Sequence, residues 1–466
     1  MIFLRFLLSL ITPCSIGWAA VTLLPRRSAS FSNIEKASLS FGLGWGILTL
    51  EMFYASLLKL PWSPFLLLLP WIVLFLFFFR RKKEKIAVAP LTRKVPLGSL
   101  ERSLLLFLLF LFLYIVIEGL TFPLMYYDMW DAWSIWGQKA KAFALQRSVD
   151  FAFFTDPSRT YAHQEYPLLL PLSESWIYLA LGKIDEQIVK LLFSLYYLCL
   201  LVLFWGALRR EKSRQTSLLL VTLLATLPIL LEYTLRAYAE VPLTFYYTLS
   251  TLYLYFWCKE GRREDLWAGV LFSAFSAWTK NEGQALWVIN AVVFGTTRFL
   301  TSSSPVRKRI FEGGILLLPL LLLLPWWLLL KRLGISSSEF FPQLRGEILL
   351  TSLSRLPVVL QAFFSRLLDI SRWNFLWIGL VLFGGLSWRK LFSFPKAPLT
   401  AALLLHLLLY LFIYLIHPLD VLWAMNVDDS LNRILLHAAP LAFFLLGSSL
   451  ENLDTFLKAV YTGKRT

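Results

Sequence analysis

The sequence predicts an all-α polytopic membrane protein, and its composition carries that prediction. Of the 466 residues, 58% are hydrophobic, above the roughly 45–50% of soluble globular domains. Charged residues make up only 16% of the chain, against about 25% in soluble proteins. The longest stretches between apolar runs hold only about 40 residues, too few for a soluble domain of ordinary size. Any chemistry is therefore expected at a membrane face.

Thirteen apolar runs are predicted to cross the membrane, for which a helix needs about 20 apolar residues. A further apolar stretch, 166–182, is interrupted by Pro167, Pro171 and Glu174. These leave too short an apolar run to span, so a half-inserted or surface-lying helix is expected there. The predicted spans are 2–24, 37–58, 62–79, 102–122, 188–208, 216–235, 240–257, 266–279, 283–299, 311–330, 373–388, 399–417 and 431–450.

The orientation follows from where Lys and Arg collect. Lys and Arg number 45 and Asp and Glu 29, giving a net charge of +16. Cytoplasmic loops carry such an excess, and the thirteen spans place every basic cluster on one side. Two long loops then face outward, and the second contains an amphipathic segment, 347–368, expected to rest in the interface. The outer loops are 124–165 and 331–372, and the basic clusters are 80–85, 209–212, 259–263, 307–309, 389–390 and 464–465.

Several other functions find no support in the sequence. No Walker loop or dinucleotide fingerprint occurs, and no basic segment carries a nucleic-acid motif. The three cysteines lie in or beside apolar runs and do not form a disulfide framework. No convincing cleavage site follows the first apolar run, so no cleavable signal peptide is expected. The closely spaced Gly42, Gly44 and Gly46 lie inside an apolar run and predict close helix packing rather than a phosphate loop.

The first outer loop is rich in reactive side chains. Asp128 and Asp131 are three residues apart among several Trp and Tyr, and would share one face of a helix. A second group, beginning at His163 and Glu165, follows where the non-spanning helix enters. The competing interpretation is an interfacial helix with an aromatic belt and solvated charges.

Three later clusters are predicted to reach the same outer face. Glu240 lies at the outer end of two spans, Lys280 and Glu282 interrupt a long apolar stretch, and Arg433 and His437 begin the last span. Ionisable groups below the membrane surface are costly and usually functional. Each cluster also has a structural explanation: a Glu that complements a helix dipole, a Lys–Glu pair, or an Arg that snorkels.

Carboxylates, cations and aromatic rings on one face suit transfer of a sugar from a lipid phosphate to a hydroxyl. A carboxylate would accept the proton of the acceptor, and cations would stabilise the departing phosphate. A lipid-linked donor also explains why no nucleotide-binding domain is present.

The order of these motifs resembles the bacterial branch of the GT-C membrane glycosyltransferases, which is akin to protein mannosyltransferases and lipid A aminoarabinose transferases. The resemblance covers roughly residue 101 to the end. The segment 1–99 is accordingly expected to be an added three-helix extension, and 100–466 the catalytic transmembrane domain. The motifs that carry the resemblance are 130–136, Lys139 with Lys141, 163–167 with Pro171, 239–242, 279–283, and Arg433 with His437 and Pro440.

The resemblance implies a GT-C-like bundle and an inverting transferase that uses a polyprenyl-phosphate sugar. It implies no cofactor, with catalysis metal-independent or loosely metal-assisted, and a multi-pass protein of the bacterial inner membrane whose site faces the periplasm or exterior. The acidic positions fall on Asp131, the implied base, and Glu240, where Asp is commoner in the family. Donor phosphate-binding residues would be Lys280 and Arg433, with Lys139 and Lys141 as helpers. Implied substrate-binding residues are Asp128, Trp136, His163, Glu165, Tyr166, Glu282 and His437.

Two other functions remain open at this point. A secondary transporter or lipid flippase would also be polytopic with buried charges, although no internal repeat is evident. A non-catalytic scaffold would not need the four clusters to converge. The expected partners are the lipid-linked donor, membrane lipids and an acceptor that is a lipid, a glycan or a protein; nucleic acid is not expected. The sequence does not identify the sugar.

Overall fold

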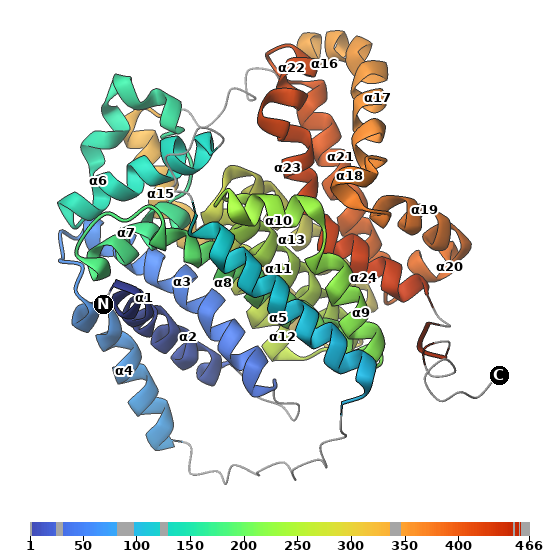
Figure 1. Cartoon of the computed structure of the whole chain (residues 1–466), viewed down its shortest axis with the longest axis horizontal. Helices are drawn as coiled ribbons and strands as arrows, with labels where there is room; N and C mark the ends of the chain where they lie inside the picture. The colour runs from blue at the N-terminus through green and yellow to red at the C-terminus, as the bar shows by residue number, and fades with distance from the viewer. Residues whose placement is uncertain are drawn as a thin grey trace.

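Helices form all the regular structure of the described residues, which confirms the all-helical fold class. No strand occurs in the described ranges. The first and last helices of the chain lie on different sides of the molecule, with α1 to α4 at the lower left and α16 to α24 at the right in Figure 1. The computed structural model describes residues 2–24, 31–81, 97–121, 129–335, 346–450, 453–455 and 457.

The α-helices of the described residues follow one another along the chain. The first twelve α-helices are α1 (Ile2–Ser9), α2 (Ile11–Leu23), α3 (Asn33–Leu57), α4 (Pro64–Arg81), α5 (Ser99–Gly119), α6 (Gln138–Gln146), α7 (Leu169–Leu181), α8 (Leu191–Arg209), α9 (Arg214–Ala225), α10 (Pro228–Leu235), α11 (Glu240–Glu260) and α12 (Arg263–Thr279). The remaining ones are α13 (Asn281–Thr301), α14 (Val306–Ile315), α15 (Leu318–Leu333), α16 (Gly346–Ser352), α17 (Leu356–Leu367), α18 (Ile370–Trp373), α19 (Leu376–Leu386), α20 (Trp388–Leu391), α21 (Ala397–Leu415), α22 (Val421–Asn426), α23 (Ser430–Leu436) and α24 (Ala439–Ser449). A π-helix, η1 (Ala132–Gly137), and a 3-10 helix, η3 (Pro157–Ala162), belong to the first outer loop.

Five helices are long and apolar enough to cross a membrane, or up to seven if two bent pairs each form one span. The pair α9 and α10 bends by 58° and the pair α23 and α24 by 53°. These helices support a membrane protein, while thirteen spans remain a prediction. Predicted span 373–388, for example, is divided, and its main helix α19 has only 11 residues. The five helices are Ile2–Leu23, Ser99–Gly119, Ile188–Arg209, Val306–Leu333 and Ala397–Leu415.

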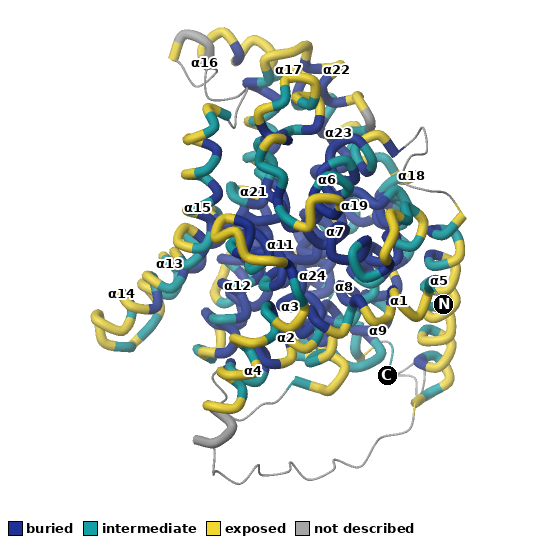
Figure 2. Tube along the Cα trace, turned by 90° about the vertical axis from the view of Figure 1, so that its left-hand side faces the viewer, coloured by how far each residue is buried: buried dark blue, intermediate teal, exposed yellow. Residues whose placement is uncertain are grey.

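One continuous hydrophobic core lies at the centre of the bundle. Helices α8, α11 and α12 pack together there and are mostly buried, whereas α5 and α14 lie at the edge and are largely exposed (Figure 2). The segment 1–99, expected to be an added extension, contributes to this core, because α3 packs against α7, α8 and α12.

The glycines of α3 confirm the prediction of close helix packing. A Cβ at Gly44 would lie 1.8 Å from the carbonyl oxygen of Pro13 in α2. Cβ atoms at Gly42 and Gly46 would lie 2.6 Å and 2.3 Å from the rings of Phe245 and Phe275. Only a residue without a side chain lets α3 approach its neighbours this closely.

Helix α7 is too short to cross a bilayer. It has 13 residues, which span about 20 Å, against a hydrocarbon thickness of about 30 Å. Most of its residues are buried against α1, α3 and α6. The short helix expected from the two prolines and Glu174 is therefore present. It does not lie on a surface, as one form of the prediction had it, because its neighbours in the protein cover it.

Several of the predicted basic clusters meet at one end of the bundle. Arg210 pairs with Glu260 at 2.7 Å, and Lys259 pairs with Glu211 at 2.8 Å. Lys396, just before α21, also pairs with Glu211. Because Glu240 and Glu260 are the first and last residues of α11, this end lies about 30 Å from Glu240.

Candidate functional site

Glu240 is the centre of a buried ion cluster. Its Oε1 accepts hydrogen bonds from Arg433 Nη2 at 3.0 Å and from Lys280 Nζ at 3.0 Å. Arg433 also pairs with Asp131, and Lys280 pairs with Glu282 at 2.9 Å. These five side chains come from four separate parts of the chain and form one connected set of three carboxylates and two cations. All five are residues predicted from the sequence.

Helix ends bring these groups together. Glu240 opens α11, Arg433 lies in α23, and Asp131 immediately precedes the π-helix η1. Lys280 lies at the break between α12 and α13, in an extended backbone conformation. Short π-helical segments inside α-helices occur frequently at functional sites.

A glycine makes the break at Lys280 possible. A Cβ at Gly283 would lie 1.9 Å from the carbonyl oxygen of Ser276. The first turn of α13 therefore packs directly against the last turn of α12, and Lys280 is held at the junction, facing Glu240.

The side chains of the cluster differ in exposure. The Glu240 side chain is 1% exposed and the Lys280 side chain 6%, whereas Asp131 is 14% and Glu282 20% exposed. A molecule approaching from outside would meet Asp131 and Glu282 first. Glu240 Oε2 and Glu282 Oε2 are buried and accept no hydrogen bond from the described residues, so the cluster retains unused acceptor capacity.

An aromatic stack borders the cluster. The Tyr166 ring stacks on His163 with centroids 4.6 Å apart and on Trp136 with centroids 5.5 Å apart. Lys280 Nζ and Lys139 Nζ each lie 5.9 Å from the centroid of the Tyr166 ring, within range of a cation–π interaction. Four predicted residues are thus linked through Tyr166 to the cation that holds Glu240.

Lys139 is fully buried in the outer loop. Its Nζ donates to the carbonyl oxygen of His163 at 2.5 Å. Burial lowers the pKa of Lys139 to about 7, although the nearby Glu165 carboxylate acts in the opposite direction. Burial disfavours the charged form of an ammonium group. The charge of Lys139 is therefore sensitive to pH near neutrality.

Glu165 lies at the rim of the stack. Its Oε1 contacts His163 Nδ1 at 2.9 Å. Burial is the largest influence and opposes ionisation, but the hydrogen bond and electrostatic attraction of His163, a backbone hydrogen bond and the Lys139 charge together hold the pKa of Glu165 below its ordinary value. Glu165 also lines a cavity of about 480 Å³, together with the polar side chains of Asp156, Thr160 and Gln164.

Three other predicted residues lie apart from the ion cluster or have no described position. Lys141 pairs with Glu186 and does not face Glu240. His437 is fully buried beneath the cluster and shares a 2.7 Å hydrogen bond with Tyr410. Asp128 lies outside the described residues.

Sequence reasoning missed an aromatic contact of the cluster and the aromatic partner of His437. The Tyr238 ring lies 4.7 Å from Arg433 Cζ, and the hydroxyl of Tyr410 contacts His437. Tyr238 could have been found from its place two residues before Glu240. Tyr410 carried no signal, because it lies in the middle of an apolar helix.

Three positive φ angles occur close to cluster residues. His163 has φ 48°, Ala237 has φ 57° and Asp429 has φ 54°. Such backbone conformations are uncommon outside glycine and cluster at functional sites. They precede Tyr166, Glu240 and Arg433 by three or four residues, so each of these side chains is presented just after a constrained turn.

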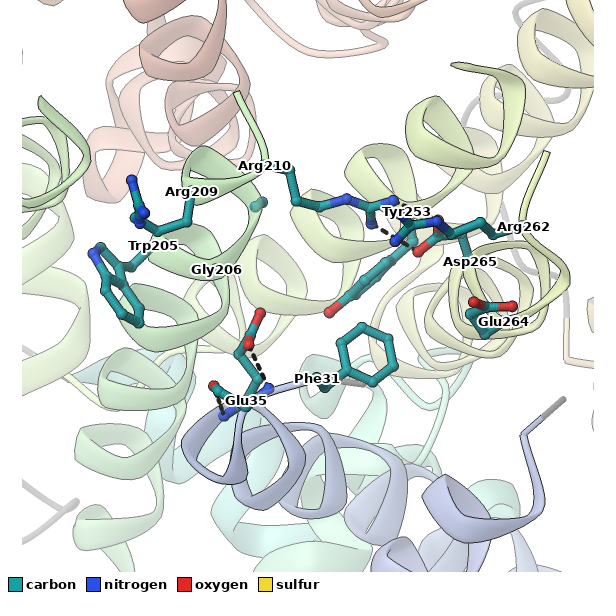
Figure 3. A pocket seen from close by; sticks show the side chains of 12 residues that line it. Phe31, Glu35, Trp205, Gly206, Arg209, Arg210, Tyr253, Arg262, Glu264 and Asp265 are labelled. Atoms are coloured by element: carbon teal, nitrogen blue, oxygen red, sulfur yellow. Dashed lines mark hydrogen bonds and ion pairs between the residues drawn. The ribbon is translucent and has the colours of Figure 1, made fainter. Parts of the chain in front are cut away.

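A separate cavity of about 260 Å³ lies at the opposite end of α11 (Figure 3). Arg210, one of its lining residues, donates to both oxygens of Asp265 at 2.8 Å and 2.7 Å. Glu35 bonds back to the backbone of Ser32. The polar groups of this cavity are thus largely paired with one another, and its chemistry differs from that at Glu240.

No group of three or more His, Cys, Asp or Glu side chains is arranged to hold a metal ion in the part of the chain that the structure describes. Comparisons with family models, with curated proteins and with solved structures find no match to this chain.

Proposed function

We propose that this protein is an inverting glycosyltransferase of the GT-C type, which moves a sugar from a polyprenyl-phosphate donor to a hydroxyl acceptor at the extracytoplasmic face of a bacterial inner membrane. The contact of Arg433 with both Asp131 and Glu240 carries the proposal. It joins a partly exposed carboxylate suited to a base with a buried cation pair suited to a phosphate.

Arg433 and Lys280 are positioned to bind an anion together. Arg433 and Lys280 converge on one oxygen of Glu240, so both point toward the same region. Charge-assisted bonds to phosphate are among the strongest in proteins. A donor phosphate that displaced Asp131 from Arg433 would gain that bond and release the Asp131 carboxylate for catalysis.

The reaction balances without a further reactant. The acceptor oxygen forms a bond to the anomeric carbon from the face opposite the phosphate, and the bond from that carbon to the phosphate oxygen breaks. Polyprenyl phosphate leaves with the bonding electron pair, stabilised by Arg433 and Lys280. The acceptor proton passes to Asp131, which acts as general base.

The aromatic stack supplies binding surface for the sugar. Tyr166 and His163 form a continuous apolar face beside the cluster, and His163 is 42% exposed. Sugar rings have apolar faces that suit such rings. The polar cavity beside Glu165 offers hydroxyl-binding groups next to it.

A panel of polyprenyl-phosphate sugars tests the proposal. The purified protein is incubated with each donor and a mixture of lipid, glycan and peptide acceptors, and free polyprenyl phosphate is measured by mass spectrometry. We expect one donor to be consumed. If no donor reacts while the protein accelerates transbilayer movement of a lipid-linked sugar in liposomes, the protein is a flippase.

A further inference from the structure

A third cavity lies among α2, α3, α4, α12 and α15, away from the ion cluster. It measures about 540 Å³, and its walls are almost entirely apolar. Its aliphatic lining includes Leu23, Ile47 and Leu271. Leu74 of α4 also lines it and is 39% exposed, so the cavity reaches the surface of the bundle. We call it the α4 groove.

Two of the helical segments that line the α4 groove are apolar and long enough to cross a membrane. Leu23 belongs to the candidate span Ile2–Leu23, and Leu322, another lining residue, belongs to Val306–Leu333. The neighbouring α4 residues Ile72 and Val73 are 46% and 57% exposed. Exposed aliphatic side chains on such helices suit contact with lipid, so the groove opens toward hydrocarbon rather than water.

One carboxyl group interrupts this apolar lining. Glu51 Oε1 accepts a hydrogen bond from Trp71 Nε1 at 2.5 Å. Glu51 Oε2 is buried and has no hydrogen-bond partner among the described residues. The hydroxyl of Tyr54, which also lines the groove, is already used, since it donates to the carbonyl oxygen of Leu322 at 2.6 Å.

An intramembrane carboxyl is costly and is a functional-site candidate by default. A buried acceptor oxygen favours an occupant that donates a hydrogen bond, and a carboxylate favours a cation over a phosphate. Two indole rings, Trp71 and Trp267, line the same groove. Aromatic faces attract ammonium groups. The Glu51 carboxylate and the two indole rings together therefore form a site that suits an amine.

The positions of Glu51 along α3 and of Trp71 along α4 suit binding of a lipid headgroup. Glu51 lies six residues before the end of α3 and Trp71 seven residues after the start of α4, about 10 Å along each helix. Because a short turn joins these two helix ends, both residues lie within about two turns of the same membrane face. A headgroup amine can reach that depth while its acyl chain follows the apolar walls.

We propose that the α4 groove binds one phospholipid whose headgroup carries a primary ammonium. The ammonium donates to Glu51 Oε2 and contacts the Trp71 ring, and an acyl chain packs along Leu74 and Leu271. The site uses none of the residues assigned to sugar transfer, so it stands or falls independently of that function.

Lipid binding to the purified full-length protein tests the site directly. Native mass spectrometry compares phosphatidylethanolamine, phosphatidylglycerol and phosphatidylcholine of identical acyl chains. We expect phosphatidylethanolamine to bind most tightly, because only its amine can both donate a hydrogen bond and pair with a carboxylate. Glu51→Gln keeps an acceptor for Trp71 but loses the charge, and should weaken phosphatidylethanolamine binding about tenfold.

A second pair of variants tests the groove itself. Leu74→Trp should fill the groove and reduce phosphatidylethanolamine binding, whereas Leu106→Trp, at a site on α5 that is 66% exposed, should leave it unchanged. The proposal is overturned if the three lipids bind equally, if phosphatidylglycerol binds best, or if Glu51→Gln binds phosphatidylethanolamine as tightly as the unmodified protein.

Discussion

Arg433 donates to one oxygen of Glu240 from two nitrogens, Nη2 at 3.0 Å and Nε at 3.3 Å. This contact fixes the guanidinium in a buried position, and its Nη2 also donates a hydrogen bond to Asp131. The Glu240 side chain is only 1% exposed. Under the proposed function, Glu240 would therefore orient the cation rather than meet the substrate.

Replacing Glu240 should cost stability. In Glu240→Gln, Lys280 and Arg433 lose their shared counter-charge inside the protein. Removing one partner of a buried ion pair typically costs about 3–5 kcal/mol. Thermal unfolding in detergent should show a clear fall in Tm, whereas Glu264→Gln, at the start of α12 and far from the cluster, should show little. An unchanged Tm for Glu240→Gln would mean that the cluster is not ionised.

Donor affinity should depend on two cations and not on a third. Lys280→Gln and Arg433→Gln each remove a charge from the proposed phosphate site, and should weaken binding of the lipid-linked donor by roughly 10- to 100-fold. Lys141→Gln is the matched control, because Lys141 pairs with Glu186. Equal losses in all three variants would assign the effect to overall charge instead of to the cluster.

Lys139 should make stability depend on pH. Burial lowers its pKa to about 7 from its ordinary value near 10.5. Between these two values the unfolded chain binds a proton that the folded protein does not, so stability should rise with pH across that range. We expect Tm to increase from pH 7 to pH 9, and the increase attributable to this group to vanish in Lys139→Met. The same slope in both proteins would contradict the assignment.

The contact between α2 and α3 gives a prediction about folding. Gly44→Ala would place a Cβ 1.8 Å from the carbonyl oxygen of Pro13, which forces the helices apart, and it should destabilise the protein by a few kcal/mol. Gly313→Ala is the control, because a Cβ at this helical glycine meets nothing within 4 Å, and alanine favours helix. Tm measurements of the two variants should move in opposite directions.

The sequence predicted the ion cluster because its members carry visible chemical signals. Glu240, Lys280 and Arg433 are ionisable residues inside or beside apolar runs. An ionisable group is energetically costly there, so its presence indicates a functional site. The short length of helix α7 was also predictable, because Pro167, Pro171 and Glu174 interrupt the apolar run and leave too few consecutive apolar residues to span a bilayer.

Other features needed the three-dimensional structure. Lys139 and Lys141 are equivalent in sequence, yet one lies beside Tyr166 and the other pairs with Glu186, because side chains two positions apart on a helix point in different directions. In the sequence, Glu51 stands alone as a charged residue in an apolar run and carries no motif. Its partner Trp71 comes from α4, and only helix packing brings the two together.

The activity of Asp131→Asn tests the central claim most directly. The variant keeps the size of the side chain and an oxygen for Arg433 but cannot act as a base, so sugar transfer should fall by about 10²–10⁴-fold while the protein stays folded. Asp150→Asn, in the same loop, should retain full activity because asparagine also caps a helix. The assay uses the donor that the unmodified protein consumes. The account would be contradicted if purified Asp131→Asn released polyprenyl phosphate from this donor as fast as the unmodified protein.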